Sequence, residues 1–434
     1  MTRRPARRMP ALGPFRPVLV PEHVELTLPS GLTVLAVRRH GEPLAELRLR
    51  IPLAGADPAP ARLLARTLFA GTASVQQLGG SLGADVNRDR LRISGRAPVG
   101  ALDRLLATLA RLLAAGAYPP SEVRVARAGL ADQLRVARSL PAQLAAAALA
   151  RRIYPGHPYG RPSPEPEEVA AVASEDLRAL HARLVRPAGC TLVLVGDLDP
   201  QAAAGTAARC LAGWTGTAPE HVLPPVPPLR PGALLLVDRP GSAQSSLRIA
   251  LPAVPRGHRD NAALRLANLV FGGYFCSRWT ANLREDKGYS YGPLSVIEDR
   301  PAGARLIASA DVATEHTAPA LVETLHELGR IACLPPDRAE VQRARDYTLG
   351  SLVVLGMSTH RDLADLAAGL VDGGLPLTYL ADYARQLAAA TVDDVHRAAA
   401  DYLAPSGAVP VLLADAARVS RAVAALAPVT VQPA

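Results

Sequence analysis

Apolar and polar positions follow the same order in two halves of the chain. Residues 32–54, LTVLAVRRHGEPLAELRLRIPLA, and residues 233–255, ALLLVDRPGSAQSSLRIALPAVP, each predict a strand, a short connection and a second strand. In the second strand of the first stretch, apolar residues at 47, 49 and 51 alternate with Arg48 and Arg50. A period of two predicts a strand with one apolar and one polar face.

The similarity resumes in two pairs of predicted helices. Residues 101–134 and 320–352 each contain an amphipathic helix, a Pro-Pro pair and a second long helix. The leucines at 102, 105, 106, 109, 112 and 113 recur with the helical period. After the Pro-Pro pairs, Ser121 and Asp337 are the expected N-caps. Residues 174–197 and 391–415 both continue as a helix and then a strand, so the pattern indicates an internal duplication.

A proline-rich stretch separates the two copies. Residues 217–232 contain six prolines in sixteen positions, which excludes a helix or a central strand. We therefore predict a first domain over residues 1–218, a linker over 219–232 and a second domain over 233–434. Each domain mixes strands with long helices, so the expected fold class is α+β. We expect two tandem homologous domains, each a mostly antiparallel sheet with helices packed on one face.

Composition and charge narrow the classes of function. The chain has 434 residues and a formal net charge of +9, but its basic residues are scattered and include a single lysine, Lys287. No run of five basic residues occurs, so we expect no nucleic-acid partner. The four cysteines are far apart and predict reduced thiols. Prolines interrupt the first twenty residues, and no apolar run is long enough for a membrane span. We expect a cytoplasmic protein with no membrane partner.

Common catalytic motifs are missing or occur in the wrong context. No two of the ten histidines lie within four residues of each other, which excludes H-E-x-x-H. Gly-x-Ser-x-Gly occurs at residues 79–83 and 288–292, around Ser81 and Ser290. A nucleophile elbow requires a strand, a sharp turn and a helix, and neither serine has this predicted context. A self-sufficient hydrolase therefore finds no supporting triad.

Residues 272–295, GGYFCSRWTANLREDKGYSYGPLS, contain a different candidate. They predict a helix that ends near Arg284, a turn at residues 286–288 and a tyrosine-rich strand, with Tyr291 seven residues after Arg284. The reversal could bring a guanidinium and a phenol together, two donors suited to a carbonyl or an oxyanion. The alternative from spacing alone is a surface arginine paired with a carboxylate and an edge tyrosine.

Six segments together resemble the pitrilysin/insulinase (M16) family of zinc peptidases, in particular its short two-domain members. They are PSGLTVLAV, LFAGT, LGGSLGADVNRDRL, YPGHPYGRP, CTLVLVGDLDP and SRWTANLREDKGYSYG, in this order along nearly the whole chain. The resemblance implies the duplicated α+β fold, which is of the kind shared with LuxS and related metallohydrolases.

Active members of that family carry H-x-x-E-H on a helix that leads into a Gly-Thr turn, where two histidines bind zinc and the glutamate is the base. Here the matching positions are Arg62, Ala65 and Arg66, and a further ligand position falls near Gln133. Arginine has no lone pair for a metal, so the resemblance implies no cofactor in this chain and zinc in a partner subunit. The two arginines could instead bind an acidic peptide segment or lie on an idle, exposed face.

The family site also has a C-terminal Arg and Tyr that hold the substrate, and Arg284 and Tyr291 match them. The resemblance thus implies a non-catalytic subunit of a heterodimeric zinc endopeptidase. It would bind peptides, and removal of a leader peptide would fit. The alternative is a scaffold, because the family includes peptidase-dead core subunits of a respiratory complex.

Overall fold

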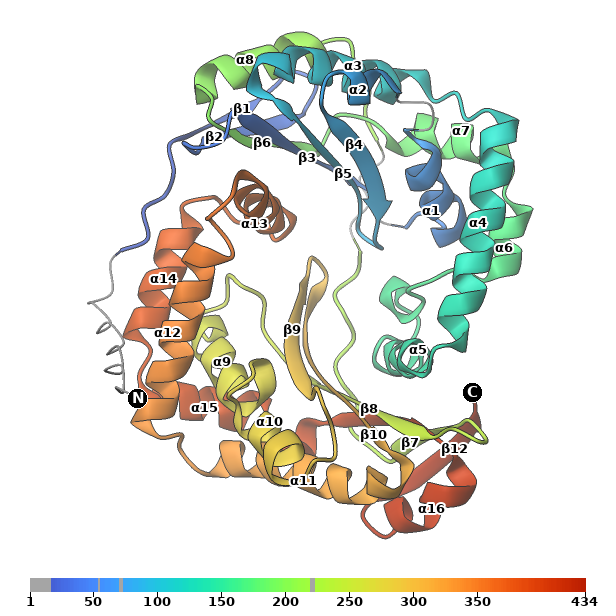
Figure 1. Cartoon of the computed structure of the whole chain (residues 1–434), viewed down its shortest axis with the longest axis vertical. Helices are drawn as coiled ribbons and strands as arrows, with labels where there is room; N and C mark the ends of the chain where they lie inside the picture. The colour runs from blue at the N-terminus through green and yellow to red at the C-terminus, as the bar shows by residue number, and fades with distance from the viewer. Residues whose placement is uncertain (1–16, 54, 70–72, 219–222) are drawn as a thin grey trace, which may run out of the picture.

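The protein consists of two sheet-and-helix units that lie one above the other along its longest axis (Figure 1). The computed structural model describes residues 17–53, 55–69, 73–218 and 223–434. The Gly71-Thr72 turn expected from the sequence, most of the first twenty residues and the start of the predicted linker lie outside the described residues. Residues 223–232 of the linker form neither helix nor strand.

Each unit is built on a six-stranded mixed sheet, and the strand order repeats. The first sheet has the order β1-β2-β6-β3-β5-β4 and the second β12-β7-β11-β8-β10-β9. Apart from the edge strands β1 and β12, the two sheets have equivalent orders, β2-β6-β3-β5-β4 and β7-β11-β8-β10-β9. The internal duplication in the sequence is therefore also present in the fold. The strands of the first sheet are β1 (His23–Thr27), β2 (Thr33–Arg38), β3 (Leu44–Pro52), β4 (Ser81–Val86), β5 (Arg90–Pro98) and β6 (Thr191–Gly196). Those of the second are β7 (Leu234–Asp238), β8 (Gln244–Pro252), β9 (Leu294–Arg300), β10 (Gly303–Ala313), β11 (Val409–Ala414) and β12 (Val429–Pro433).

Helices surround both sheets. In the first half they are α1 (Pro58–Thr67), α2 (Ala73–Gln77), α3 (Leu102–Ala115), α4 (Pro120–Ser139), α5 (Pro141–Ile153), α6 (Pro166–Ala171), α7 (Ser174–Leu184) and α8 (Pro200–Leu211). In the second they are α9 (Asn261–Asn268), α10 (Arg278–Thr280), α11 (Thr317–Cys333), α12 (Arg338–Val354), α13 (His360–Asp372), α14 (Tyr379–Ala389), α15 (Val392–Tyr402) and α16 (Ala416–Ala424). Two π-helical segments, η3 (Leu269–Gly273) and η4 (Ala281–Asp286), flank α10. The predicted α+β class with two domains is confirmed.

One predicted N-cap is right and one is wrong. Asp337 caps α12, and its backbone N–H donates to Glu340 Oε2 at 2.8 Å. Ser121 is not a cap, because α4 begins at Pro120 and Pro119 is the N-cap residue. Proline suits the first helical position, since its missing N–H would have no partner there.

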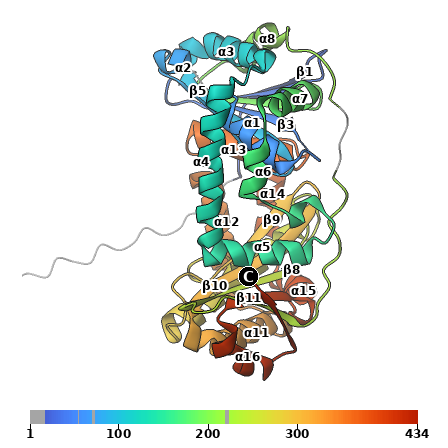
Figure 2. The ribbon, with the colours of Figure 1, turned by 90° about the vertical axis from the view of Figure 1, so that its right-hand side faces the viewer.

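One helix of each unit packs against the sheet of the other unit. α13, from the second half, packs on β3 and β6 of the first sheet, and α5, from the first half, packs on β8 and β11 of the second. Figure 2 shows α4 descending from the first unit to α5, which lies beside β8. The prediction of helices on one face of each sheet is therefore incomplete, because the opposite face carries a helix from the other unit.

Because α13 packs on the first sheet, the predicted polar face of β3 is buried. Arg48 is only 3% exposed. Its guanidinium donates from Nε to Asp365 of α13 at 2.5 Å and from Nη1 to Glu46 at 2.8 Å. Arg50 forms an ion pair with Asp372, at the end of the same helix, at 3.3 Å. Buried arginines need such partners, and here the second unit supplies most of them.

No helix in the described parts of the chain combines the length and apolarity needed to cross a bilayer.

Candidate functional site

The positions that the family resemblance aligns with a zinc motif lie on α1, which packs against α4. Asp57 caps α1 by accepting from Ala59 N–H at 3.1 Å, and Leu63 and Leu64 anchor the helix in the core. Arg66 Nη1 donates to Gln133 Oε1 of α4 at 2.6 Å. The structure therefore brings together the motif helix and the position that the family resemblance aligns with a further ligand.

These residues do not fit a zinc ion. Arg62 and Arg66 offer no lone pair, Ala65 has no donor atom, and the one side-chain oxygen, on Gln133, already accepts from Arg66. Two guanidinium groups would also repel a dication. Across the described ranges, no three His, Cys, Asp or Glu side chains gather in a way that could hold a metal.

Arg62 and Arg66 differ in their surroundings. Arg66 is exposed and lies against α4, whereas Arg62 is half-buried and turns toward the loop before α6. Arg62 Nη2 donates to the carbonyl of Pro162 and to Ser163 Oγ, both at 3.1 Å. Burial lowers the pKa of Arg62, and no carboxylate among the described residues offsets this effect. The two side chains are therefore held by different elements, Arg62 by residues 162–163 and Arg66 by α4.

Arg284 and Tyr291 meet, as the helix-to-strand reversal predicts. The backbone N–H groups of Tyr289 and Ser290 both donate to the carbonyl of Leu283, at 2.8 and 3.2 Å, which turns the chain back on η4. The Arg284 guanidinium carbon lies 4.6 Å from the ring centre of Tyr291 and 4.5 Å from that of Phe275. The tyrosine-rich strand, however, is wrong: β9 begins only at Leu294, after both tyrosines.

The geometry leaves both donors accessible. Arg284 contacts both rings by cation–π interactions, which do not require its N–H groups as hydrogen-bond donors. It also has a 3.4 Å ion pair with Glu285, and Tyr291 is 85% exposed. Contacts with two aromatic rings restrain the partly exposed guanidinium, which suits it to donate to an incoming carbonyl.

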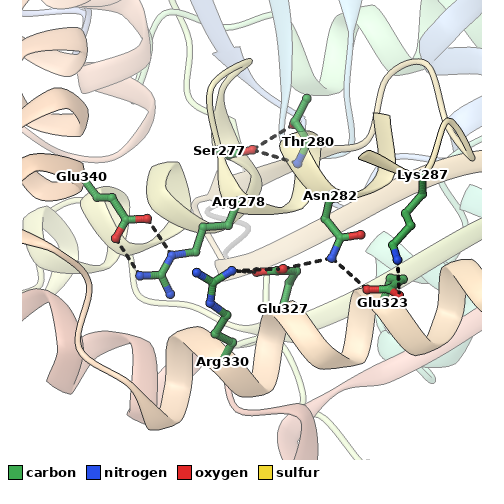
Figure 3. Close-up of polar contacts among 9 residues, drawn as sticks. All are labelled: Ser277, Arg278, Thr280, Asn282, Lys287, Glu323, Glu327, Arg330 and Glu340. Atoms are coloured by element: carbon green, nitrogen blue, oxygen red, sulfur yellow. Dashed lines mark hydrogen bonds and ion pairs between the residues drawn. The ribbon is translucent and has the colours of Figure 1, made fainter. Parts of the chain in front are cut away.

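A polar network fixes the helical segment that carries Arg284 (Figure 3). Arg278 forms a two-pronged pair with Glu340 at 2.7 and 2.6 Å. Asn282 Nδ2 donates to Glu323 and Glu327 of α11 at 2.8 and 3.0 Å. Further contacts in Figure 3 are Lys287–Glu323, Arg330–Glu327 and Ser277–Thr280. The buried Trp279 and Leu283 add apolar anchors, so the segment is held on both sides.

A cleft of about 860 Å³ lies between α5 and the β8–β10 face of the second sheet, and sequence reasoning missed it. Arg62 lines it, but Arg284 and Tyr291 do not. Arg248, in the cleft wall, pairs with Asp311 at 3.0 Å, and the Asp311 carbonyl accepts from Ser290 Oγ at 2.9 Å. The Arg284–Tyr291 segment thus adjoins the cleft through Asp311. The one local signal in the sequence is Arg248, which stands between Leu247 and Ile249 in the second strand predicted within residues 233–255.

Comparison with known proteins agrees with this architecture. Residues 171–347 match the sequence family described as the peptidase M16 inactive domain. No curated protein matches the chain in sequence.

Solved structures match nearly the whole chain. The peptidase M16 inactive domain from Pseudomonas fluorescens is 24% identical, with a TM-score of 0.82 over 90% of this chain and 97% of that one. A protease from Helicobacter pylori is 18% identical, with a TM-score of 0.81 over 91% and 100%. A chain of Complex III2 from Candida albicans is 14% identical, with a TM-score of 0.79 over 92% and 98%. At these identities the likeness establishes a shared fold.

Proposed function

We propose that the chain is a non-catalytic member of the M16 peptidase family and serves as the substrate-binding subunit of a heterodimeric zinc endopeptidase. The observation that carries the proposal is the contrast between its two halves. The first half has arginine and alanine where the family resemblance places zinc ligands and base, while the second holds a partly exposed Arg284 against an exposed Tyr291. A chain without a role in substrate binding has no need of that pair.

In this proposal the subunits divide the chemistry. A partner with an H-x-x-E-H motif would supply zinc and the general base, and this chain binds no cofactor. Arg284 and Tyr291 donate hydrogen bonds to the peptide carbonyl and to the oxyanion that develops from it. Fixed donors of this kind act most strongly when charge forms in the transition state. The substrate is a peptide, the complex works in the cytoplasm, and removal of a leader peptide is a reaction of the right size.

The test compares this chain alone with a mixture of this chain and an M16 partner that has the zinc motif. We expect stoichiometric zinc in the partner, none in this chain, and peptide cleavage only in the mixture. Arg284→Gln should lower kcat of the mixture by about 10²–10³, the effect of losing one oxyanion donor. Tyr291→Phe removes only the phenol O–H and should also lower kcat.

Matched controls separate this role from general damage. Arg421→Gln and Tyr347→Phe alter an exposed arginine and a partly exposed tyrosine on other helices and should leave kcat unchanged. Zinc-dependent cleavage by the isolated chain would contradict the proposal. Full activity of the mixture with both Arg284→Gln and Tyr291→Phe would reduce the chain to a scaffold.

The scaffold is the second candidate function, and the match to a chain of Complex III2 favours it. It predicts that this chain raises the stability or solubility of its partner without changing its kcat. The substitutions at 284 and 291 would then have no kinetic effect, so the same experiment separates the two candidates.

A further inference from the structure

The cleft beside α5 carries an excess of positive charge. Its ionised lining side chains are two glutamates, Glu165 and Glu298, and six arginines: Arg62, Arg138, Arg151, Arg161, Arg248 and Arg300. These arginines come from both halves of the chain, so the positive surface exists only in the assembled molecule.

Four of the six arginines already have a carboxylate partner. The pairs are Arg138–Glu165, Arg161–Glu168, Arg248–Asp311 and Arg300–Glu298. Among the residues that the structure describes, Arg62 and Arg151 have none. Arg88 lies near this part of the cleft, and burial and the positive charge of Arg161 lower its pKa, although Asp57 and Asp89 partly offset them. The positive charge without a paired carboxylate in this cleft is therefore that of Arg62 and Arg151, among the residues that the structure describes.

Arg62 is also preorganised to bind a ligand. Its Nη2 is tied to Pro162 and Ser163, which fixes the plane of the guanidinium. In the described structure, Nε and Nη1 have no acceptor. Nε and Nη1 can each donate a charge-assisted hydrogen bond to a carboxylate, whereas both forked edges of the guanidinium include Nη2, which is already occupied.

The walls favour a peptide over a nucleic acid. Ala146, Ala147 and Ala150 of α5 line the cleft with small side chains, and its volume lies within the usual range for ligand sites. Its rings, on Tyr154, His157 and Tyr159, are buried and offer no face for a base to stack on.

We propose that this cleft holds an acidic segment of the peptide substrate, with the Arg62 guanidinium bound to an aspartate or glutamate carboxylate. The inference rests on the proposed function, since it names the class of peptide that the subunit receives. It uses residues other than Arg284 and Tyr291, so an arginine at a former zinc position has become a specificity residue.

The test measures binding to the full-length chain alone, without a partner and without cleavage. Three labelled peptides of equal length would carry glutamate, glutamine or lysine at the same positions, and fluorescence anisotropy would give Kd. We expect the glutamate peptide to bind at least about tenfold more tightly than the glutamine peptide, and the lysine peptide to bind least. Added salt should weaken the first interaction.

Substitutions assign the effect to the cleft. Arg62→Gln should weaken binding of the glutamate peptide about tenfold and leave the glutamine peptide unchanged, whereas Arg62→Lys keeps the charge and should lose less. Arg421→Gln, which removes an exposed arginine from α16, should match the unaltered chain. Thermal unfolding of each variant confirms that it is folded.

Three outcomes would overturn the inference: equal Kd values for the three peptides, no effect of Arg62→Gln, or tighter Arg62-dependent binding of a single-stranded oligonucleotide of equal length. Failure here differs from failure of the proposed function. If only this inference fails, the preference for acidic peptides is absent but the mixture still shows Arg284-dependent cleavage. If only the proposed function fails, the preference for acidic peptides remains but the Arg284-dependent cleavage is absent.

Discussion

A substitution at Leu363 tests whether packing of α13 stabilises the first unit. Its side chain is 1% exposed and belongs to an apolar cluster that α13 forms with Leu35, Val37 and Val193 of the first sheet. Leu363→Ala removes a buried side chain at this junction and leaves a cavity. Leucine-to-alanine changes in well-packed cores cost about 2.7–5.0 kcal/mol, and we expect about 3 kcal/mol here.

The loss should appear in a part of the chain that is distant in sequence. The cluster stabilises β2 and β6, so undocking of α13 exposes one face of both strands. A loss of about 3 kcal/mol corresponds to roughly 10²-fold faster hydrogen exchange for amides that open with this junction. Exchange of peptides that cover residues 33–38 and 191–196, measured by mass spectrometry, reports this directly.

A matched control is Leu264→Ala, which alters an equally buried leucine in the second unit's own core. It should speed exchange in the second sheet and its helices, with a smaller effect on β2 and β6. The reasoning is refuted if Leu363→Ala leaves exchange in β2 and β6 unchanged while the second unit loosens. Helix α13 would then belong to its own half alone.

Three further predictions concern buried polar groups and thiols. Arg48→Met leaves Glu46, 7% exposed, without its partner and should lower the free energy of unfolding in urea by about 3–5 kcal/mol; Arg48→Met with Glu46→Leu should recover part of this. Burial lowers the pKa of His181, so the unfolded chain takes up protons first as the pH falls. The stability that the neutral ring provides is complete above about pH 6.5 and is lost below it, and His181→Gln should flatten the urea-unfolding profile between about pH 7.5 and 5.5. A thiol reagent should label the exposed Cys276 in the native protein but reach Cys190 only on unfolding, because Cys190 is buried and burial raises its pKa.

The sequence predicts what depends on local periodicity and on duplication. Alternation in residues 44–52 and 244–252, and the leucine stripe from residue 102, are local signals, and the strands and helix lie there. The meeting of Arg284 with Tyr291 also followed from a short reversal. The strand expected at the tyrosines was wrong, because two bonds to the Leu283 carbonyl hold that segment in a turn.

Long-range placement could not be predicted in the same way. The alternation predicted that Arg48 and Arg50 lie on a polar face of the strand. Nothing in the sequence of the first half indicates that a helix from the second half covers this face. For the same reason the cleft was missed, since its wall combines α5 with strands more than ninety residues away. The separate surroundings of Arg62 and Arg66 likewise arise from tertiary contacts with residues 162–163 and with α4.

Because α5 and α13 each pack on the sheet of the other unit, cutting the chain at its proline-rich connection would not yield two complete domains. Either half expressed alone would expose to water the leucine, valine and alanine side chains on one face of its sheet. Its helix α5 or α13 would have no sheet to pack against. Co-expressed fragments, in contrast, carry complementary surfaces and could reassemble without a covalent link. The tether matters mainly for raising the local concentration of one fragment around the other.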